Sequence, residues 1–237
     1  MLDLQELDAR ADLLRHQRSH LPELAEIAEL RATRTDLDNR ARDAQIVVDD
    51  LTEEQSKIDV DVEQGRARRT RDQERVDQGL ITNPKDLQRM LSELESLQRR
   101  ITTLEDQELE VMEQIETAQR ELDALTTQVA AADERLAVLT GSRDDKTGTF
   151  ERELDTVSAE REPIAAGLPG DLLALYEKLR ELKGGVGAAP LRARQCGGCQ
   201  LSIDPSELAQ IKAAGSDEVI RCEECQRILV RTADSGL

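Results

Sequence analysis

The sequence has 237 residues, of which 35% are charged and 1% aromatic, with one Phe, one Tyr and no Trp. Aromatic side chains supply large buried areas, so their scarcity excludes a compact globule of this length. Abundant Leu, Ala, Glu and Arg predict long helices or coiled coil, and the regular spacing of apolar residues argues against a disordered acidic chain. A formal net charge of −18 would repel nucleic acid if it were spread evenly.

The N-terminal residues predict a short helix followed by a kink. The helix has an apolar series with helical spacing: Leu4, Leu7, Ala11 and Leu14. Pro22 marks a kink near residues 20–22. A second kink is expected at the same level near residues 140–149, where the apolar seam of a later helix is interrupted. Beyond the kink we expect the first helix to pack on Phe150, Leu154 and Val157.

Two longer apolar series predict a coiled-coil hairpin. Their members alternate gaps of three and four residues, the period with which one helix packs against another along a narrow seam. The first series is Ile27, Leu30, Arg34, Leu37, Ala41, Ala44, Val48, Leu51, Gln55, Ile58 and Val62. The second is Leu87, Met90, Leu94, Leu97, Ile101, Leu104, Glu108, Val111, Ile115, Ala118, Leu122, Leu125, Val129, Ala132, Leu136 and Leu139.

The link between the two series predicts a tight turn near residues 79–84. Gly79 can close the first helix in the left-handed conformation, while Asn83 as N-cap and Pro84 at the first position open the next. So short a link predicts antiparallel helices. The numbers of facing seam residues then sum to 162 or 163. Gln55 faces Glu108 in this register, and we predict that the pair helps to fix it, because slipped alignments leave both side chains unpaired.

The remaining boundaries follow from proline, glycine and leucine spacing. Pro163 is expected to end the long third helix. Residues 169–185 predict a short amphipathic helix with four leucines on one face: Leu172, Leu175, Leu179 and Leu182. We therefore divide the chain into a helical hairpin at 1–168, a connecting helix at 169–183 and a C-terminal domain at 184–237.

All four cysteines lie in two CxxC pairs, Cys196 with Cys199 and Cys222 with Cys225. Each pair can turn two thiolates toward one metal ion, and two pairs complete a tetrahedral shell. We predict one structural Zn²⁺, because four cysteine ligands leave no open position for water or substrate. Two disulfides fit poorly with a cytoplasmic chain, and redox release of the zinc is a further alternative.

The segments around the cysteines predict a zinc ribbon with an inserted helix. The 22-residue spacer offers Asp204 as N-cap, Pro205 at the first helical position, Glu207 at the third and Gly215 as terminator. Short apolar stretches flank both cysteine pairs. The predicted fold class is mainly α: a long antiparallel coiled-coil hairpin with a short extra N-terminal helix, followed by a small ribbon of β structure with one inserted helix.

Several stretches resemble the bacterial C4-type zinc-ribbon, coiled-coil-hairpin proteins, a group that includes the flagellar regulator FlgZ. These stretches are TNPKDLQRMLSELESLQRRI, LPGDLLALYEKLRELKGG, KGGVGAAP, CGGC and CEECQRILV. The resemblance implies the hairpin and ribbon, the four cysteines as zinc ligands, and no enzymatic activity. Relatives in this group bind protein partners, including an alternative sigma factor, and in one branch messenger RNA. Gln200 and Gln226 depart from the pattern, because a glycine often follows each cysteine pair.

Basic side chains are the candidate contacts with a partner. Between Pro190 and Arg231 six of them balance six acidic residues: Arg192, Arg194, Lys212, Arg221, Arg227 and Arg231. Near the hairpin tip, Arg66, Arg68, Arg69 and Arg71 could dock an acidic partner or phosphates, or form a solvated face paired with acidic neighbours. His16 and His20 lie four residues apart without a third metal ligand, so we expect them to face solvent.

The function that these features predict is a non-enzymatic adaptor or regulator without a small-molecule substrate. The ribbon is expected to bind a protein partner, with RNA or DNA as a further possible ligand, and the coiled coil to serve as a rigid scaffold. One alternative is a transcription factor of the RNA-polymerase-channel type, acting through Asp77 and Asp86 at the tip; another is a redox-sensitive zinc switch. No apolar run suffices for a membrane span or an export signal, so we expect a cytoplasmic protein without membrane contact.

Overall fold

The computed structural model describes residues 1–237. Its helices are α1 (Leu2–Ser19), α2 (Pro22–Asp77), α3 (Pro84–Ala166), α4 (Gly170–Leu182) and α5 (Pro205–Ala213), and its strands are β1 (Ala188–Arg192), β2 (Gln195–Cys196) and β3 (Ile228–Val230). The predicted fold class is confirmed. The chain forms two compact units, Glu26–Val138 and a second unit that joins Met1–Ala25 to Leu139–Leu237. None of the helices is both long and apolar enough to cross a membrane.

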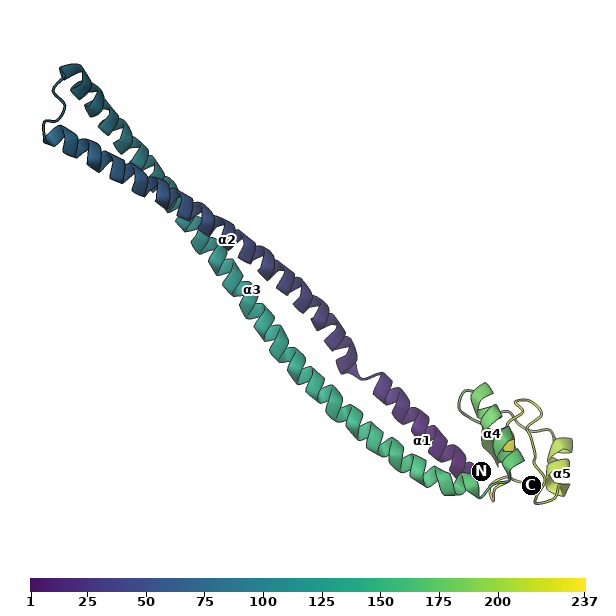
Figure 1. Ribbon diagram of the computed structural model, residues 1–237. Coiled ribbons are helices and arrows are strands. Elements are labelled where there is room, and N and C mark those ends of the chain that lie inside the picture. Colours follow the sequence, from purple (N-terminus) through teal and green to yellow (C-terminus); the bar gives the residue numbers. More distant parts are fainter. The chain divides into compact units, whose positions relative to one another are not determined.

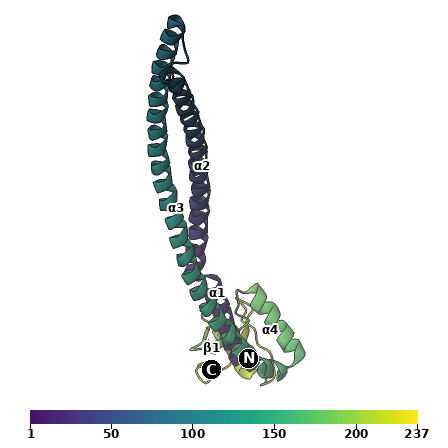
Figure 2. The same ribbon diagram turned by 60° about the vertical axis from the view of Figure 1, so that its left-hand side comes forward.

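The unit Glu26–Val138 pairs α2 with α3 in opposite directions (Figures 1 and 2). The direction follows from ion pairs between the helices: Glu26 with Arg135, Arg34 with Asp133, and Arg66 with Glu105. Every residue of the two predicted series is buried or half-buried, whereas nearly all positions between them are exposed. The exceptions, Asp38, Glu93 and Glu105, are acidic side chains held in ion pairs. The spacing of apolar residues therefore predicted the seam correctly.

The hairpin turn lies where the sequence placed it. Gly79 has a φ of 68°, and the N–H of Leu80 donates to the carbonyl of Arg75 at 3.2 Å, which closes the end of α2. Asn83 caps α3, because its Oδ1 accepts a hydrogen bond from the N–H of Lys85 at 2.9 Å.

The polar residues of the seam differ in how they are satisfied. Arg34 donates from Nε to Asp133 at 3.0 Å and also lies near Asp38, and the hydrogen bond to Asp133 raises the pKa of Arg34. Gln55 and Glu108 are half-buried, and no hydrogen bond joins them. Their role in fixing the register stays a prediction.

In the second unit, α1 packs on the C-terminal part of α3 as predicted. Ala11, Leu14 and Val157 are buried together, and Leu7, Phe150 and Leu154 pack against them. The break between α1 and α2 covers only two residues, and α3 continues as a helix through residues 140–149. The series of apolar seam residues is interrupted at this level, but the helix continues. His16 and His20 are exposed, with ring centroids 4.0 Å apart.

A polar contact replaces the seam where α2 begins. The buried carboxylate of Glu23 accepts a hydrogen bond from Ser142 Oγ at 3.1 Å and pairs with Lys146. The hydrogen bond from Lys146 holds the pKa of Glu23 below its usual value. This pairing joins the start of α2 to α3 through polar side chains.

Two expectations for the helix ends are wrong. Pro163 does not end α3, which continues to Ala166. Proline lacks an N–H, but its carbonyl still accepts the N–H of Gly167 at 3.1 Å, so the last turn closes after it. Leu182 is 65% exposed, because α4 ends at this residue and Tyr176, with no exposed surface, completes the packed face instead.

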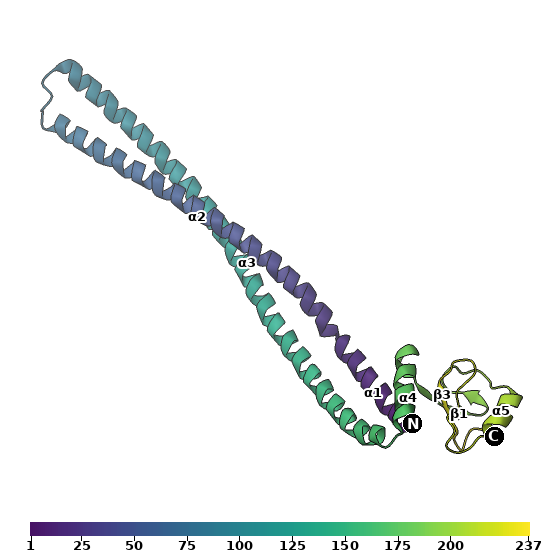
Figure 3. The ribbon, with the colours of Figure 1, turned by 45° about the vertical axis from the view of Figure 1, so that its right-hand side comes forward.

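The face of α4 packs between α1 and the sheet (Figure 3). The core at this junction contains Leu4, Ala165, Tyr176, Leu179, Ala188 and Ile228. The sheet has the order β2-β1-β3, in which β1 is antiparallel to β2 and parallel to β3. The predicted inserted helix is α5, capped by Asp204, whose Oδ1 accepts the N–H of Ser206 at 2.8 Å.

A buried polar network joins α1, α3 and α4. Asp8 is only 2% exposed and accepts hydrogen bonds from Tyr176 Oη and Arg161 Nε, both at 2.7 Å. Arg180 lies 3.6 Å from the same carboxylate and donates to Asp12 at 2.6 Å. Burial and the bond to Asp8 raise the pKa of Tyr176, and the bond to Asp8 raises the pKa of Arg161. One carboxylate thus connects three helices.

Gln5, one turn before Asp8, connects α1 to the start of the ribbon. Its Nε2 donates to the carbonyl of Gly185 at 2.8 Å, and its Oε1 accepts the N–H groups of Gly187 at 2.7 Å and Ala188 at 3.2 Å. A Cβ on Gly187 would lie 2.6 Å from the carbonyl oxygen of Tyr176, so only glycine fits there. The side-chain amide therefore fixes the strand β1 against α1.

We expect Asp8→Ala to destabilise this unit by about 3–5 kcal/mol, because it leaves two arginines and a tyrosine hydroxyl without their shared acceptor. Tyr176 is the sole tyrosine and the chain has no Trp, so its fluorescence during urea unfolding reports on this junction. Glu6→Ala, an exposed carboxylate on the same helix, should leave the transition within about 0.5 kcal/mol. Equal transitions for the two variants would contradict the role of Asp8.

Candidate metal centre

The four cysteine sulfurs converge on one point in the ribbon. They lie within 4.8 Å of one another, with Cys196 Sγ 3.8 Å from Cys225 Sγ and Cys199 Sγ 3.9 Å from Cys222 Sγ. Zn–S bonds of about 2.3 Å at tetrahedral angles place sulfur atoms about 3.8 Å apart. None of the cysteines forms a disulfide. The spacing fits one tetrahedral zinc ion, with all four positions taken by protein.

The two cysteine pairs form equivalent turns. In the first, the N–H of Gln200 donates to the carbonyl of Cys196 at 2.7 Å, and in the second Gln226 donates to Cys222 at 2.8 Å. Both glutamines have a φ of 62°, in the left-handed region where glycine is usual. The departure at these positions therefore leaves the geometry intact: glutamine adopts the backbone conformation that the turn needs.

The thiols differ in how readily each gives up its proton. Burial raises the pKa of Cys196 and raises that of Cys222 to about 12. Burial also acts on Cys225, but hydrogen bonds from the backbone and side chain of Arg227 and from neighbouring thiols outweigh it and lower its pKa to about 7. Zinc must displace protons from the buried thiols, so its affinity for this site falls as pH falls.

Arg227 holds the two halves of the ribbon together. Its guanidinium donates to the carbonyls of Val186 at 2.9 Å, Lys183 at 2.9 Å and Gly198 at 3.3 Å. The side chain lies over the first cysteine pair, since a Cβ on Gly198 would come within 2.7 Å of Arg227 Cδ. Arg227 was one of the predicted partner contacts, but its donors are directed into the ribbon.

Arg231 has a similar structural role. It donates to the carbonyls of Ile211 at 3.1 Å and Ala214 at 2.7 Å, and also to Gly215. These are carbonyls at the C-terminal end of α5, so Arg231 caps the inserted helix. Gly215, the expected terminator, lies beyond the helix, which ends because Ala214 takes an extended conformation.

The other predicted ribbon contacts are exposed. Arg221 donates to the carbonyl of Gln226 at 3.1 Å, and Arg194 donates to that of Gly236 at 3.1 Å. Arg192 and Lys212 are exposed and form no ion pair. Arg194 and Lys212 come together at a groove beside α5 of about 500 Å³, whose lining includes Ile203, Pro205 and Leu208.

The C-terminal residues complete the site in a way that the sequence did not reveal. The carbonyls of Asp234 and Ser235 accept the N–H groups of Ala193 at 2.7 Å and Arg194 at 3.0 Å, both of which have positive φ. Ser235 is buried, and its hydroxyl donates to the carbonyl of Leu191. These polar residues carry no motif, so only the folded chain shows that they hold the loop before the first cysteine pair.

The candidate contacts near the hairpin tip are mostly engaged by neighbours. Arg66 pairs with Glu63 and Glu105, and Arg68 with Glu93. Arg69 occupies a seam position, where its Nε is buried without a partner, whereas Arg71 is exposed and makes no ion pair. The tip carboxylates also have neighbours: Asp77 accepts from Gln73, and Asp86 lies near Arg89.

Comparison with known proteins agrees with this architecture. Residues 4–184 match the CT398-like coiled coil hairpin domain. The chain belongs to the CT398-like hairpin family. Residues 195–229, which include all four cysteines, match the C4-type zinc ribbon domain. The four clustered thiols and this match support one structural zinc ion.

Relatives cover nearly the whole of this CT398-like chain. The protein Rv2229c of Mycobacterium tuberculosis (strain H37Rv) is 35% identical over 98% of this chain and 94% of its own length. A solved structure from Mycobacterium smegmatis has a TM-score of 0.83 and 33% identity, covering 97% of this chain and 95% of that one. CT398 from Chlamydia trachomatis has a TM-score of 0.70 at 18% identity, over 98% and 95% of the two chains. That second likeness shows the fold.

We expect purified protein to contain one zinc ion per chain and Cys222→Ser to abolish stoichiometric zinc. A module with so small an apolar core depends on its metal, so the amides of β1 and β3 should lose hydrogen-exchange protection in a strong chelator while those of α2 keep theirs. Elemental analysis and exchange mass spectrometry measure both effects. Ser202→Ala, a matched change beside the site, should retain the metal; a metal-free ribbon with full protection would refute the prediction.

Arg227→Lys keeps the positive charge but cannot donate to three carbonyls in a fixed fork, so we expect a loss of about 1–3 kcal/mol in ribbon stability. The measurement is the rate of zinc transfer to a chromophoric chelator, which should be higher for Arg227→Lys than for the wild-type protein. Arg221→Lys, which removes a single backbone contact, is the control and should change the rate much less. Equal rates for the two variants would mean that charge alone matters at residue 227.

Proposed function

We propose that this protein is a non-enzymatic adaptor whose zinc ribbon binds a protein partner while the coiled-coil hairpin serves as scaffold. The observation that carries the proposal is the closed shell of four cysteine sulfurs, within 4.8 Å of one another, which leaves the metal no position for water or substrate. A metal of this kind organises a surface instead of performing chemistry. The combination of hairpin and ribbon is itself that of a scaffold-like protein.

The ribbon surface offers a specific place for such contact. The groove beside α5 has an apolar lining with Ile203 and Leu208, and two basic side chains, Arg194 and Lys212, at its edge. Neither base forms an ion pair within the chain, and Arg194 is held in place by the carbonyl of Gly236. Arg192 lies two residues from Arg194 and is also exposed. An acidic surface with an apolar side chain complements this arrangement.

RNA or DNA is the alternative ligand for the same basic side chains, and salt dependence separates the two. Three phosphate contacts would weaken binding by about 40-fold between about 50 and 200 mM salt, because counterions are released when the nucleic acid binds. The ribbon has no aromatic side chain on which bases could stack. This absence favours protein over single-stranded nucleic acid.

The test is affinity isolation from native lysate with and without nuclease, using the wild-type chain and the variant Arg194→Glu/Lys212→Glu. We expect a protein partner to be retained after nuclease treatment and lost with the double variant. Arg89→Glu/Arg120→Glu, the same charge change on the hairpin, should retain it. Loss of the partner on nuclease treatment, with steep salt dependence for a labelled RNA or DNA oligonucleotide, would replace the protein partner by nucleic acid. Retention by the double variant would exclude the ribbon groove.

A further inference from the structure

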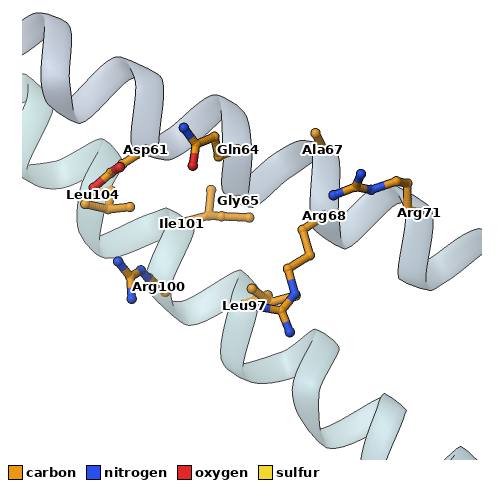
Figure 4. Close-up of a pocket in the computed structure, with 10 residues that line it drawn as sticks. All are labelled: Asp61, Gln64, Gly65, Ala67, Arg68, Arg71, Leu97, Arg100, Ile101 and Leu104. Atoms are coloured by element: carbon orange, nitrogen blue, oxygen red, sulfur yellow. The ribbon is translucent and has the colours of Figure 1, made fainter.

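A groove opens between α2 and α3 within the unit Glu26–Val138 (Figure 4). Its volume is about 480 Å³. Its apolar lining is Gly65, Ala67, Leu97, Ile101 and Leu104, and its polar lining is Asp61, Gln64, Arg68, Arg71 and Arg100. The groove therefore combines an aliphatic floor with three arginines and one carboxylate.

The two helices approach closely beside the groove, where the seam contains a glycine. Gly65 follows Val62 in the heptad pattern but has no side chain, and a Cβ built on it would lie 3.1 Å from Ile101 Cγ1. Ile101 is 3% exposed and points toward Gly65 (Figure 4), whereas Leu97 and Leu104 on either side are only half-buried. The next seam position on α2 is Arg69, which cannot fill the space with apolar atoms.

Two of the three arginines that line the groove lack acidic partners, unlike most arginines of this hairpin. Arg68 reaches toward α3 and pairs with Glu93. Arg71 and Arg100 are exposed and make no ion pair. In the whole stretch Glu26–Val138 the arginines without an ion pair are Arg31, Arg69, Arg71, Arg99 and Arg100, and all but Arg31 belong to the two segments that flank the groove. In a chain with a net charge of −18, this local excess of positive charge is unusual.

We propose that this groove docks an acidic amphipathic helix of a partner protein. One or two aliphatic side chains of the helix fill the space above Ile101, and its carboxylates pair with Arg71 and Arg100. Helices commonly bind in this way, with an apolar face in a groove and charged residues at the rim. Guanidinium groups bind carboxylates through paired hydrogen bonds, and the two free arginines need not break an existing ion pair first. The proposal does not depend on the ribbon or its metal.

The lining favours a protein over nucleic acid. The half-buried Leu97 and Leu104 present aliphatic surface, which offers no hydrogen bond or charge to phosphates and sugars. The chain has no Trp, and no aromatic residue lies between Glu26 and Val138 on which bases could stack. The acidic remainder of the chain repels a long polyphosphate more strongly than a short acidic segment, because the polyphosphate carries more charge.

The test uses the full-length protein and a fluorescein-labelled helical peptide with leucines along one face and glutamates along the other. We expect Arg71→Glu/Arg100→Glu to weaken binding of this peptide at least about tenfold. Ala67→Phe, which fills the groove without changing charge, should weaken it to a similar extent. The matched controls Arg31→Glu/Arg120→Glu and Ala32→Phe lie elsewhere on the hairpin and should leave the affinity within about twofold. Circular dichroism should show equal helix content in all variants.

Four results would overturn the proposal. The first is no binding of the peptide by the wild-type chain, and the second is an equal loss of affinity for the control and groove variants. The third is unchanged binding of a peptide in which serine replaces every leucine, which would show charge attraction without a groove. The fourth is displacement of the peptide by a single-stranded RNA oligonucleotide that depends on Arg71 and Arg100, which would assign the patch to nucleic acid. The expected RNA result is no displacement.

Discussion

The chain has almost no aromatic side chains from which to build a core, and every part of its structure depends on packing aliphatic residues without them. With one Phe, one Tyr and no Trp, apolar burial can proceed only along a line of aliphatic residues or around a separate organising group. Between Glu26 and Val138 the line is the seam of α2 and α3, where Ile27, Val62 and Ile101 are each at most 3% exposed. In the ribbon, four cysteines surround the space for a zinc ion that organises a small apolar cluster.

Where helices and ribbon meet, hydrogen bonds and ion pairs between buried polar groups add to the apolar packing. Asp8 is buried yet fully engaged by a tyrosine and two arginines, and Gln5 bonds three backbone groups at the start of the ribbon. Such networks stabilise a structure most when their buried charges have partners, because an isolated buried charge is costly. Asp8 meets this condition, whereas Arg180 Nε lacks a hydrogen-bond partner. Such networks also tolerate no slippage, since carboxylate, guanidinium and hydroxyl must meet at hydrogen-bond distances. The single tyrosine is placed where its hydroxyl has a charged acceptor.

Some arginines of this protein hold its own backbone together, whereas others are free to contact a partner. Arg227 and Arg231 direct their donors at backbone carbonyls and hold the ribbon together. Arg194, Arg71 and Arg100 remain available at the edges of grooves. The net charge of a segment cannot separate these cases, because both kinds of arginine count equally. Contacts with the main chain decide which side chains are free to meet a partner, and the two grooves together would let one scaffold carry two ligands.

The sequence by itself determined the helical seam, the turn at Gly79 and Asn83, the helix inserted after Asp204 and the four metal ligands. Each depends on residues close together in the chain, or on a period that repeats without interruption, so local chemistry suffices to predict it. The packing of α1 on α3 could be predicted for the same reason, because each helix carries an apolar series that needs a partner. The tertiary structure alone decided the roles of Asp8, Tyr176, Arg227 and Ser235, and the groove at Gly65. These depend on contacts between residues up to 183 positions apart, such as those of Gln5 with the ribbon. No spacing rule relates side chains that only the folded backbone brings together.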